Sequence, residues 1–172
     1  MFPARTIPAK KLVTCTNKRN YRKGSPGGIE ENGRPVDITL YIRTAQMLSG
    51  MTILLVEDDP DTLVLTKLIL TQCHADVLEA GGAVEGLKQL LMHKPDVIVS
   101  DIGMPHMNGY EFIQEVRNLP PHIGGQVPAL ALSAFTRSED RTRALNAGFQ
   151  KYLSKPVDIK TLRDAIVNIT GR

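Results

Sequence analysis

The chain has 172 residues, of which 42% are hydrophobic and 23% are charged, and its formal net charge is +3. This length suits one domain of common size plus an appendage. No apolar run approaches the roughly 18 residues that a membrane span requires, and the start lacks the apolar stretch of a secretory signal. Two cysteines, Cys15 and Cys73, make no disulfide or metal-ligand framework, so we expect a reduced, cytoplasmic setting.

The positive charge is concentrated at the start of the chain. Residues 1–50 hold nine lysines and arginines against three acids, whereas residues 51–172 hold twelve against fifteen. The first 35 residues include a Gly-Ser-Pro-Gly-Gly run and few large apolar side chains, a composition that predicts disorder. We therefore expect a basic extension over residues 1–50 and a folded domain over residues 51–172.

Three interpretations of the extension stay open. Tyr21 lies in the basic run 18–23, which would suit nucleic acid, but no recognition fold surrounds it and this interpretation is disfavoured. Residues 1–29 contain no acid, as in organellar transit peptides, yet they are poor in serine and carry early prolines. The third interpretation takes Met51 as the natural start of the domain and the extension as upstream reading frame or the remnant of a larger parent.

Residues 37–48 differ from the rest of the extension. Asp37 suits a helix N-cap and Gly50 suits a helix stop. Apolar side chains recur between them near helical spacing, at Ile38, Tyr41, Ile42, Ala45 and Leu48. This pattern predicts a short amphipathic helix.

The first strand and helix of the domain have clear boundaries. The apolar run at 52–56 predicts a strand that is buried on both faces. Asp59 and Pro60 then combine an N-cap with proline at the first helical position, and the helix that they begin extends to about Cys73. We expect Cys73 to end this helix as a small buried hydrophobe.

The same alternation continues to the end of the chain. A strand at 75–79 precedes a helix at 83–93, whose inward side chains we expect to be Val84, Leu87, Leu90 and Leu91. Further strands are predicted at 96–100, 128–132 and 150–154, and further helices at 109–118, 138–147 and 158–169. The fold class is therefore α/β, a flavodoxin-like, doubly wound, five-stranded parallel sheet with helices on both faces. In such sheets ligands bind outside the carboxyl ends of the strands.

Three acids stand at the ends of two of these strands. Glu57 and Asp58 follow the first strand directly, and Asp101 follows the third. If the two strands are parallel neighbours, the acids converge, and crowded carboxylates repel one another unless a hard cation lies among them. The alternative is ordinary chemistry of a helix start, but Asp59 already fills the cap position. The pattern therefore predicts a Mg²⁺ site.

Four segments resemble the signature stretches of two-component response-regulator receiver domains, the CheY-like superfamily. They occur in the family's order and near its separations, and the resemblance covers residues 51–172. The segments read LVEDDP at Leu55–Pro60, SDIGMPHMNGYE at Ser100–Glu111, ALSA at Ala131–Ala134 and LSKP at Leu153–Pro156.

The resemblance implies a role for each acid. Asp101 would be the phosphoacceptor and Asp58 a direct Mg²⁺ ligand. Glu57 would hold a water of the metal, and the Gly103 carbonyl would supply another oxygen. Lys155 would bind the phosphoryl group, aimed inward by a cis bond to Pro156, as in this family.

The resemblance also implies a switch. Ser133 would donate its hydroxyl to the phosphoryl group, and Tyr152 would move inward in response. The alternative is a purely structural role, in which Ser133 is a small hydroxyl at a strand end and Tyr152 is a buried core tyrosine. Two residues depart from the family pattern: Asn108 stands where Asp is more frequent, and Gly103 places no side chain over the acids. These departures bear on the dephosphorylation rate.

The function implied is that of a stand-alone phosphoacceptor response regulator. A histidine kinase or phosphotransfer protein would phosphorylate Asp101, and the signal would pass through contacts with a downstream protein. Such a chain catalyses only its own phosphotransfer and dephosphorylation, so it is not an enzyme in the ordinary sense. Because the chain ends directly after the last helix, we expect no C-terminal DNA-binding domain.

Two other functions stay open. One is a Mg²⁺-dependent phosphohydrolase that forms an aspartyl phosphate from a small substrate, although such an enzyme would normally carry a second acid at the position of Gly103. The other is a phosphate-sink receiver detached from a hybrid kinase. It differs from the first interpretation only in its partners.

Overall fold

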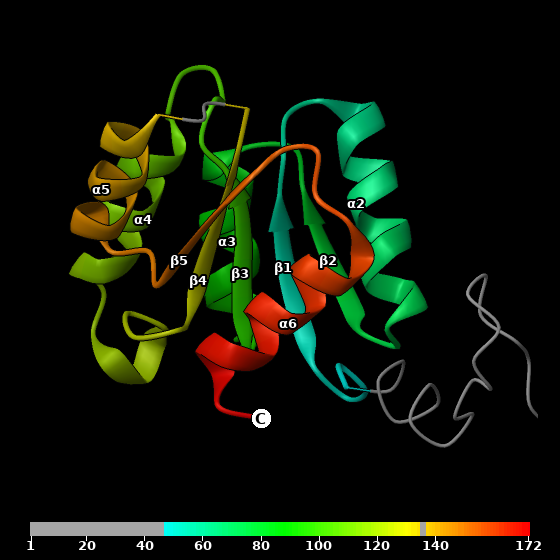
Figure 1. Cartoon of the computed structure of the whole chain (residues 1–172). Coiled ribbons are helices and arrows are strands. Elements are labelled where there is room, and N and C mark those ends of the chain that lie inside the picture. The colour runs from blue at the N-terminus through cyan, green and yellow to red at the C-terminus, as the bar shows by residue number, and fades with distance from the viewer. Residues whose placement is uncertain (1–46, 135–136) are drawn as a thin grey trace, which may run out of the picture. The chain divides into compact units, whose positions relative to one another are not determined.

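The structure is a computed structural model that describes residues 47–134 and 137–172 (Figure 1). These residues all fall within one compact unit. The helix predicted at 37–48 lies outside the described residues except for its end, where Met47–Gly50 forms a turn. The expectations for residues 1–46 also lie outside them.

In the described part of the chain, strands and helices alternate as expected from residue 52 onward. Four of the five strands begin one residue later than predicted. The elements are β1 (Thr52–Val56), α2 (Pro60–Gln72), β2 (Asp76–Ala80), α3 (Ala83–His93), β3 (Val97–Asp101), α4 (Gly109–Asn118), the 3-10 helix η1 (Pro121–Ile123), β4 (Ala129–Ser133), α5 (Ser138–Ala147), β5 (Lys151–Ser154) and α6 (Ile159–Thr170).

The five strands form one parallel sheet in the order β2-β1-β3-β4-β5. Helices α2 and α6 cover one face, and α3, α4 and α5 cover the other (Figure 1). This is the predicted doubly wound fold, and its strand order reverses between β1 and β3. The ligand-binding end of such a sheet lies at this reversal, outside the carboxyl ends of the strands.

Alternation along the central strands divides the core into two layers. Leu54 and Val56 of β1 join the layer under α3, α4 and α5, whereas Ile53 and Leu55 join the layer under α2 and α6. All four are fully buried, because helices on both faces of a parallel sheet leave neither face exposed to solvent. The central strands are therefore packed on both faces, and the residues at their carboxyl ends start from a fixed frame.

The core begins upstream of the expected start of the domain. Leu48 is fully buried with Met51 and Leu70 in the layer under α2 and α6. The N–H of Met51 donates to the Leu48 carbonyl at 3.1 Å. Residues before Met51 thus contribute to packing, and the domain boundary itself stays a prediction.

The prediction of which α3 side chains face the core is wrong at two positions, Val84 and Leu91. Val84 and Leu91 are 57% and 46% exposed, whereas Leu90 is fully buried. Gly86 faces the core, where an added Cβ would lie only 3.0 Å from Val56 and 3.1 Å from Phe112. The helix approaches the sheet most closely at this glycine, so its buried side is centred there and Val84 and Leu91 turn outward.

The predicted role of Cys73 is confirmed: it follows α2 as the capping residue and is buried. Among the described helices, none is both long enough and apolar enough to cross a membrane.

Candidate functional site

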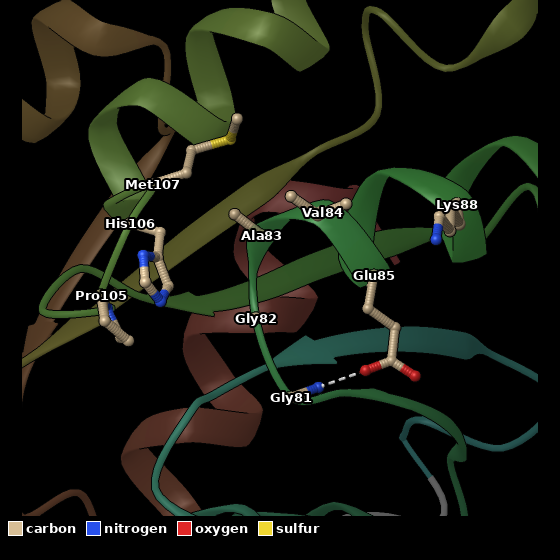
Figure 2. A pocket seen from close by; sticks show the side chains of 9 residues that line it. All are labelled: Gly81, Gly82, Ala83, Val84, Glu85, Lys88, Pro105, His106 and Met107. Atoms are coloured by element: carbon tan, nitrogen blue, oxygen red, sulfur yellow. Dashed lines mark hydrogen bonds between the residues drawn. The ribbon is translucent and has the colours of Figure 1, made fainter.

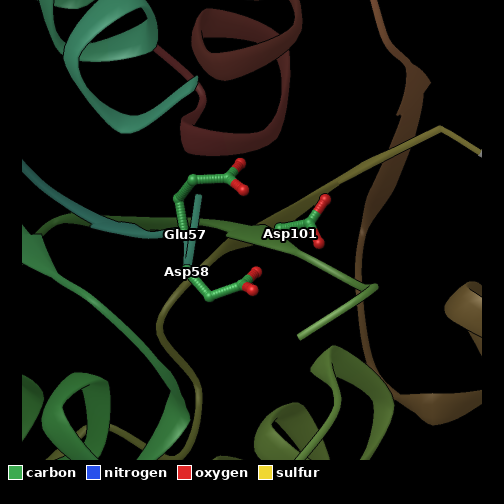
Figure 3. Close-up of side chains that lie close together, drawn as sticks. All are labelled: Glu57, Asp58 and Asp101. Carbon is green, nitrogen blue, oxygen red and sulfur yellow. The ribbon is translucent and has the colours of Figure 1, made fainter. Parts of the chain in front are cut away.

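Three carboxylates meet at the carboxyl edge of the sheet, as expected. Glu57 and Asp58 follow β1, and Asp101 ends β3. The register pairs Val56 with Ser100, which places the next residues of the two strands side by side. One carboxylate oxygen from each acid lies within 4.8 Å of the others (Figure 3). Glu57 and Asp101 are buried and Asp58 is exposed, so the cluster opens to solvent on one side.

Lys155 lies between the two buried acids. Its Nζ is 2.6 Å from Glu57 Oε2 and 2.6 Å from Asp101 Oδ1. The lysine follows β5, its backbone N–H donates to the Ser133 carbonyl at 2.8 Å, and its bond to Pro156 is cis, as expected. One ammonium group therefore faces two carboxylates, and with Asp58 the cluster keeps a surplus of negative charge.

Burial and charge act in opposite directions on this pair. Burial raises the pKa of Glu57 above its ordinary value; repulsion by Asp101 adds to this, and the hydrogen bond from Lys155 opposes it. Burial alone would lower the pKa of Lys155, but its hydrogen bonds to Asp101 and Glu57 outweigh that effect and raise it. Lys155 therefore stays protonated, and the carboxylates carry the electrostatic cost of crowding.

Gly103 lets the loop after β3 fold back on Asp101. Its N–H donates to Asp101 Oδ2 at 2.6 Å, and a Cβ added there would lie 3.2 Å from the same oxygen. Each carboxylate oxygen of Asp101 thus has its own donor, Lys155 on Oδ1 and Gly103 on Oδ2. The metal role predicted for the Gly103 carbonyl stays a prediction.

Ser133 and Tyr152 lie on adjacent strands. Ser133 ends β4, is buried and pairs with Ser154 in the register, while Tyr152 pairs with Ala131. Leu132 pairs with Asp101, so Ser133 stands one residue beyond that acid at the same edge. The Tyr152 ring is half-buried against the layer under α3, α4 and α5. Their switch roles stay predictions.

Asn108 has a structural role that sequence reasoning missed. Its side chain accepts from the N–H groups of Tyr110 and Glu111 at 3.0 Å, and the Glu111 carboxylate accepts from the Asn108 N–H at 2.9 Å. This reciprocal capping box begins α4. The spacing of Asn108 and Glu111 is the signal that could have revealed it.

Gly109, the first residue of α4, is needed for space and not for its backbone conformation. Glycine is the default residue where a loop needs a positive φ, but Gly109 is not among the positive-φ glycines of the described residues. A Cβ added to it would lie only 2.4 Å from the Asp101 carbonyl oxygen. Glycine is needed here so that α4 can approach the end of β3.

A pocket of about 320 Å³ lies next to this edge, between the loop before α3 and the loop before α4 (Figure 2). The Glu85 carboxylate accepts from the Gly81 N–H at 2.8 Å and so is already engaged. Lys88 and His106 line the pocket among small and apolar residues. It therefore lacks the convergent charges of the acidic cluster.

The sequence profile of the response regulator receiver domain matches residues 53–167. A 14.6 kDa protein encoded 3′ of sodA1 in Leptolyngbya boryana is 48% identical over 113 residues, which are 66% of this chain and 85% of that protein. Regulator of RpoS from Escherichia coli K12 is 34% identical over 122 residues, 70% of this chain. The chain spans only 35% of the length of that second relative.

Solved structures agree with the sequence matches. A putative response regulator from Chloroflexus aurantiacus has a TM-score of 0.67 and 29% identity, over 71% of this chain and 98% of that one. The receiver domain of the sensor histidine kinase PA1611 from Pseudomonas aeruginosa, solved with a magnesium ion coordinated in its active site cleft, has a TM-score of 0.66 and 28% identity, over 72% and 100%. With the fold, the strand order and the acidic edge, these matches show that the chain belongs to the response regulator receiver domain family of two-component systems.

Proposed function

We propose that this chain is a phosphoacceptor response regulator that carries the phosphoryl group on Asp101. The observation that supports this most strongly is the cluster itself. Three carboxylates meet within 4.8 Å, two of them buried, and among the described residues one ammonium group, that of Lys155, faces them. A protein gains no stability from such crowding, whereas phosphoryl transfer needs a carboxylate nucleophile among groups that hold positive charge.

The cluster fits Mg²⁺. It offers hard carboxylate oxygens on the open side of the sheet edge, and Mg²⁺ prefers one or two such ligands together with water. We assign Asp58 and Asp101 as direct ligands, Glu57 as the holder of a metal-bound water and the Gly103 carbonyl as a further ligand. When bound, the ion neutralises charge that develops on the transferred group.

In the transfer step, an oxygen of Asp101 forms a bond to phosphorus while the bond from phosphorus to the donor atom breaks. The electron pair of that bond leaves with the donor, a histidine nitrogen or an acetate oxygen. Lys155 is already 2.6 Å from Asp101, so its ammonium can shift from the carboxylate to the oxygens of the arriving phosphoryl group. Gly103 keeps the Asp101 side chain in place through its N–H.

The proposed partners are a histidine kinase or a histidine phosphotransfer protein, and a downstream target protein, in a cytoplasmic setting. A match to the sensor histidine kinase RcsC of Salmonella typhimurium, 31% identical over 124 residues, is consistent with such a relay. Phosphorylated Asp101 would bias Ser133 and Tyr152. Ser133→Ala should then accept phosphate but lose most of the change in amide exchange over residues 137–160; a full response in that variant would remove Ser133 from the switch.

Phosphorylation of Asp101 is tested with acetyl phosphate and Mg²⁺, followed by intact-mass measurement. The wild-type chain should gain one phosphoryl mass that hydroxylamine removes. The control Asp76→Asn, which changes an exposed acid at the amino end of the strands, should gain the same mass. Asp101→Asn should gain none. Uptake by Asp101→Asn at the wild-type rate would contradict the proposal.

A further inference from the structure

Helices α4 and α5 meet at a tyrosine that is covered by an arginine. The guanidinium carbon of Arg143 on α5 lies 4.3 Å from the centroid of the Tyr110 ring on α4. This is the geometry of a cation–π contact, and Tyr110 beneath it is only 8% exposed. Among the described residues, no carboxylate lies within 4 Å of the Arg143 guanidinium, so the ring is the group that holds this charge.

Tyr110 follows a glycine that is in contact with the end of β3. The N–H of Gly109 donates to the Ile102 carbonyl at 3.0 Å. A Cβ on Gly109 would lie 2.4 Å from the Asp101 carbonyl oxygen, so the backbones of α4 and β3 touch at this point. Because the contact is close-packed, the start of α4 does not move independently of Asp101.

Tyr152, the candidate switch aromatic, packs on the same layer as Tyr110. Tyr110 is a buried member of the layer under α3, α4 and α5, and Tyr152 is a half-buried neighbour of that layer. Burial raises the pKa of Tyr110, and Tyr152 is among the groups that raise it further, which places the two phenols near each other. A Tyr152 ring that moves further into this packed layer has to displace Tyr110 or α5. Either displacement separates Arg143 from the Tyr110 ring.

Arg143 has room to leave the ring. One hollow of about 360 Å³ lies between α4 and α5, and another of about 430 Å³ lies along α5. Arg143 and Asn146 line both hollows, so the exposed arginine side chain stands between two open spaces. Its guanidinium can therefore move off Tyr110 without any repacking of the core.

We propose that Arg143 is a positioning residue: its contact with the Tyr110 ring holds α5 against the start of α4 in the unphosphorylated arrangement. This role rests on the proposed function, in which Tyr152 moves inward once Asp101 carries a phosphoryl group. A cation–π contact at an exposed site shifts an equilibrium about two- to fivefold, which is enough to bias a switch without fixing it.

A positioning role differs measurably from a structural one. A contact that is the same in both arrangements stabilises the fold but leaves the affinity of Asp101 for a phosphoryl analogue unchanged. A contact made only in the unphosphorylated arrangement opposes binding of that analogue, and by reciprocity its removal tightens binding. Loss of a positive charge would by itself weaken the binding of an anion, so tighter binding would not arise from charge alone.

The first test examines the contact in the unphosphorylated full chain by amide hydrogen exchange of α5. Arg143→Gln should speed this exchange about two- to fivefold in the wild-type background. It should do the same in Tyr110→Phe, which keeps the ring face, and should have no effect in Tyr110→Leu, which lacks it. An equal effect of Arg143→Gln in the Tyr110→Leu background would mean that the two side chains act separately, and would overturn the proposal.

The second test measures the Kd of beryllofluoride, an anionic analogue of the phosphoryl group, in the presence of Mg²⁺. The Kd of Arg143→Gln should be about two- to fivefold lower than that of the wild type. Arg143→Lys keeps a cation for the ring and should return toward the wild-type value. Arg141→Gln removes the same charge from another side of α5 and should not lower the Kd.

An unchanged or higher Kd in Arg143→Gln would overturn the positioning role. Failure of the wild type itself to bind beryllofluoride would instead contradict the proposed function and remove the positioning role with it. The exchange measurement would still report whether Arg143 and Tyr110 hold α4 and α5 together, so the two failures are distinguishable.

Discussion

Two partly buried cations at opposite ends of the sheet show how differently the two ends are built. At the amino end, Arg117 of α4 donates to the carbonyls of Gly148 and Gly125 at 3.0 and 2.9 Å and to Gln150 Oε1 at 3.2 Å. All three acceptors are neutral. At the carboxyl end, Lys155 faces two carboxylates at 2.6 Å with a third close by.

The difference separates a structural group from a chemical one. The fork of Arg117 ties together the loops before β4 and β5, because its donors reach oxygens of both loops. Burial lowers the pKa of Arg117. An arginine side chain nevertheless stays protonated in proteins, so the clamp keeps its charge and its donors. The carboxyl end instead keeps unmatched negative charge, which stability does not require. Variants at the amino end should therefore change stability, and variants at the carboxyl end should change binding.

The largest effect is expected at the acids. Asp58→Ala should weaken Mg²⁺ binding by at least about 100-fold, because a charged ligand of the proposed site is lost. The free energy of unfolding should not fall, since one repulsive charge is removed. Mg²⁺ titration and denaturant unfolding measure the two quantities. Wild-type Mg²⁺ affinity in Asp58→Ala, with Asp76→Ala as the control, would remove the metal assignment.

At the other end of the sheet, Arg117→Leu should lower the free energy of unfolding by about 2–4 kcal/mol, because the Gly125 carbonyl loses its donor and the Gly148 carbonyl loses one of two. Phosphorylation of the folded variant should proceed at the wild-type rate. The matched control is Arg141→Leu on the exposed side of α5, with an expected change within about 0.5 kcal/mol. If both variants unfold alike, Arg117 is not a clamp.

A third variant tests where the domain begins. Leu48→Ala should lower the free energy of unfolding by about 2–3 kcal/mol, because a fully buried leucine leaves a cavity in the layer under α2 and α6. Met47→Ala, at a neighbouring exposed side chain, should change it by less than about 0.5 kcal/mol. Chains that begin at Met51 lack Leu48 and should melt lower for the same reason. Equal stability of the two variants would restore residue 51 as the boundary.

The smallest effect concerns Cys73, a neutral group in the apolar layer. Burial raises the pKa of its thiol. A raised pKa means that the folded state favours the protonated thiol over the thiolate. The contribution of this preference to the free energy of unfolding is fully present below the pKa of Cys73 in the unfolded state, and it is lost as the pH rises through the pKa in the folded state. In a Cys15→Ser chain, thiol labelling at pH 8 should be far slower in buffer than in denaturant. Equal rates would show that Cys73 is accessible.

The sequence predicted the frame of the molecule well, for identifiable reasons. The apolar runs of β1, β3 and β4 are buried on both faces, so each reads as a strand without ambiguity. Parallel strands then bring Glu57, Asp58 and Asp101 to one edge, and the convergence follows from the order of the chain alone.

Features that depend on close approach could not be predicted in the same way. Gly86 rotates the buried side of α3, and Gly109 makes room for the Asp101 carbonyl; both effects arise from tertiary contacts within about 3 Å. The resemblance placed Lys155 at the site, but its direct contact with Glu57 and the clamp of Arg117 join residues far apart in the sequence. The spacing of residues along the chain does not predict such contacts.

The central claim is that the acids are crowded for a cation and a phosphoryl group and not for the fold. Its most direct test is the free energy of unfolding of the wild type and Asp101→Asn, each with and without Mg²⁺. Without Mg²⁺ the variant should be at least as stable as the wild type, and added Mg²⁺ should stabilise the wild type by about 2.7 kcal/mol at 100 times its Kd and the variant by much less. A variant that is less stable without Mg²⁺, and that gains as much from Mg²⁺ as the wild type, would contradict the claim.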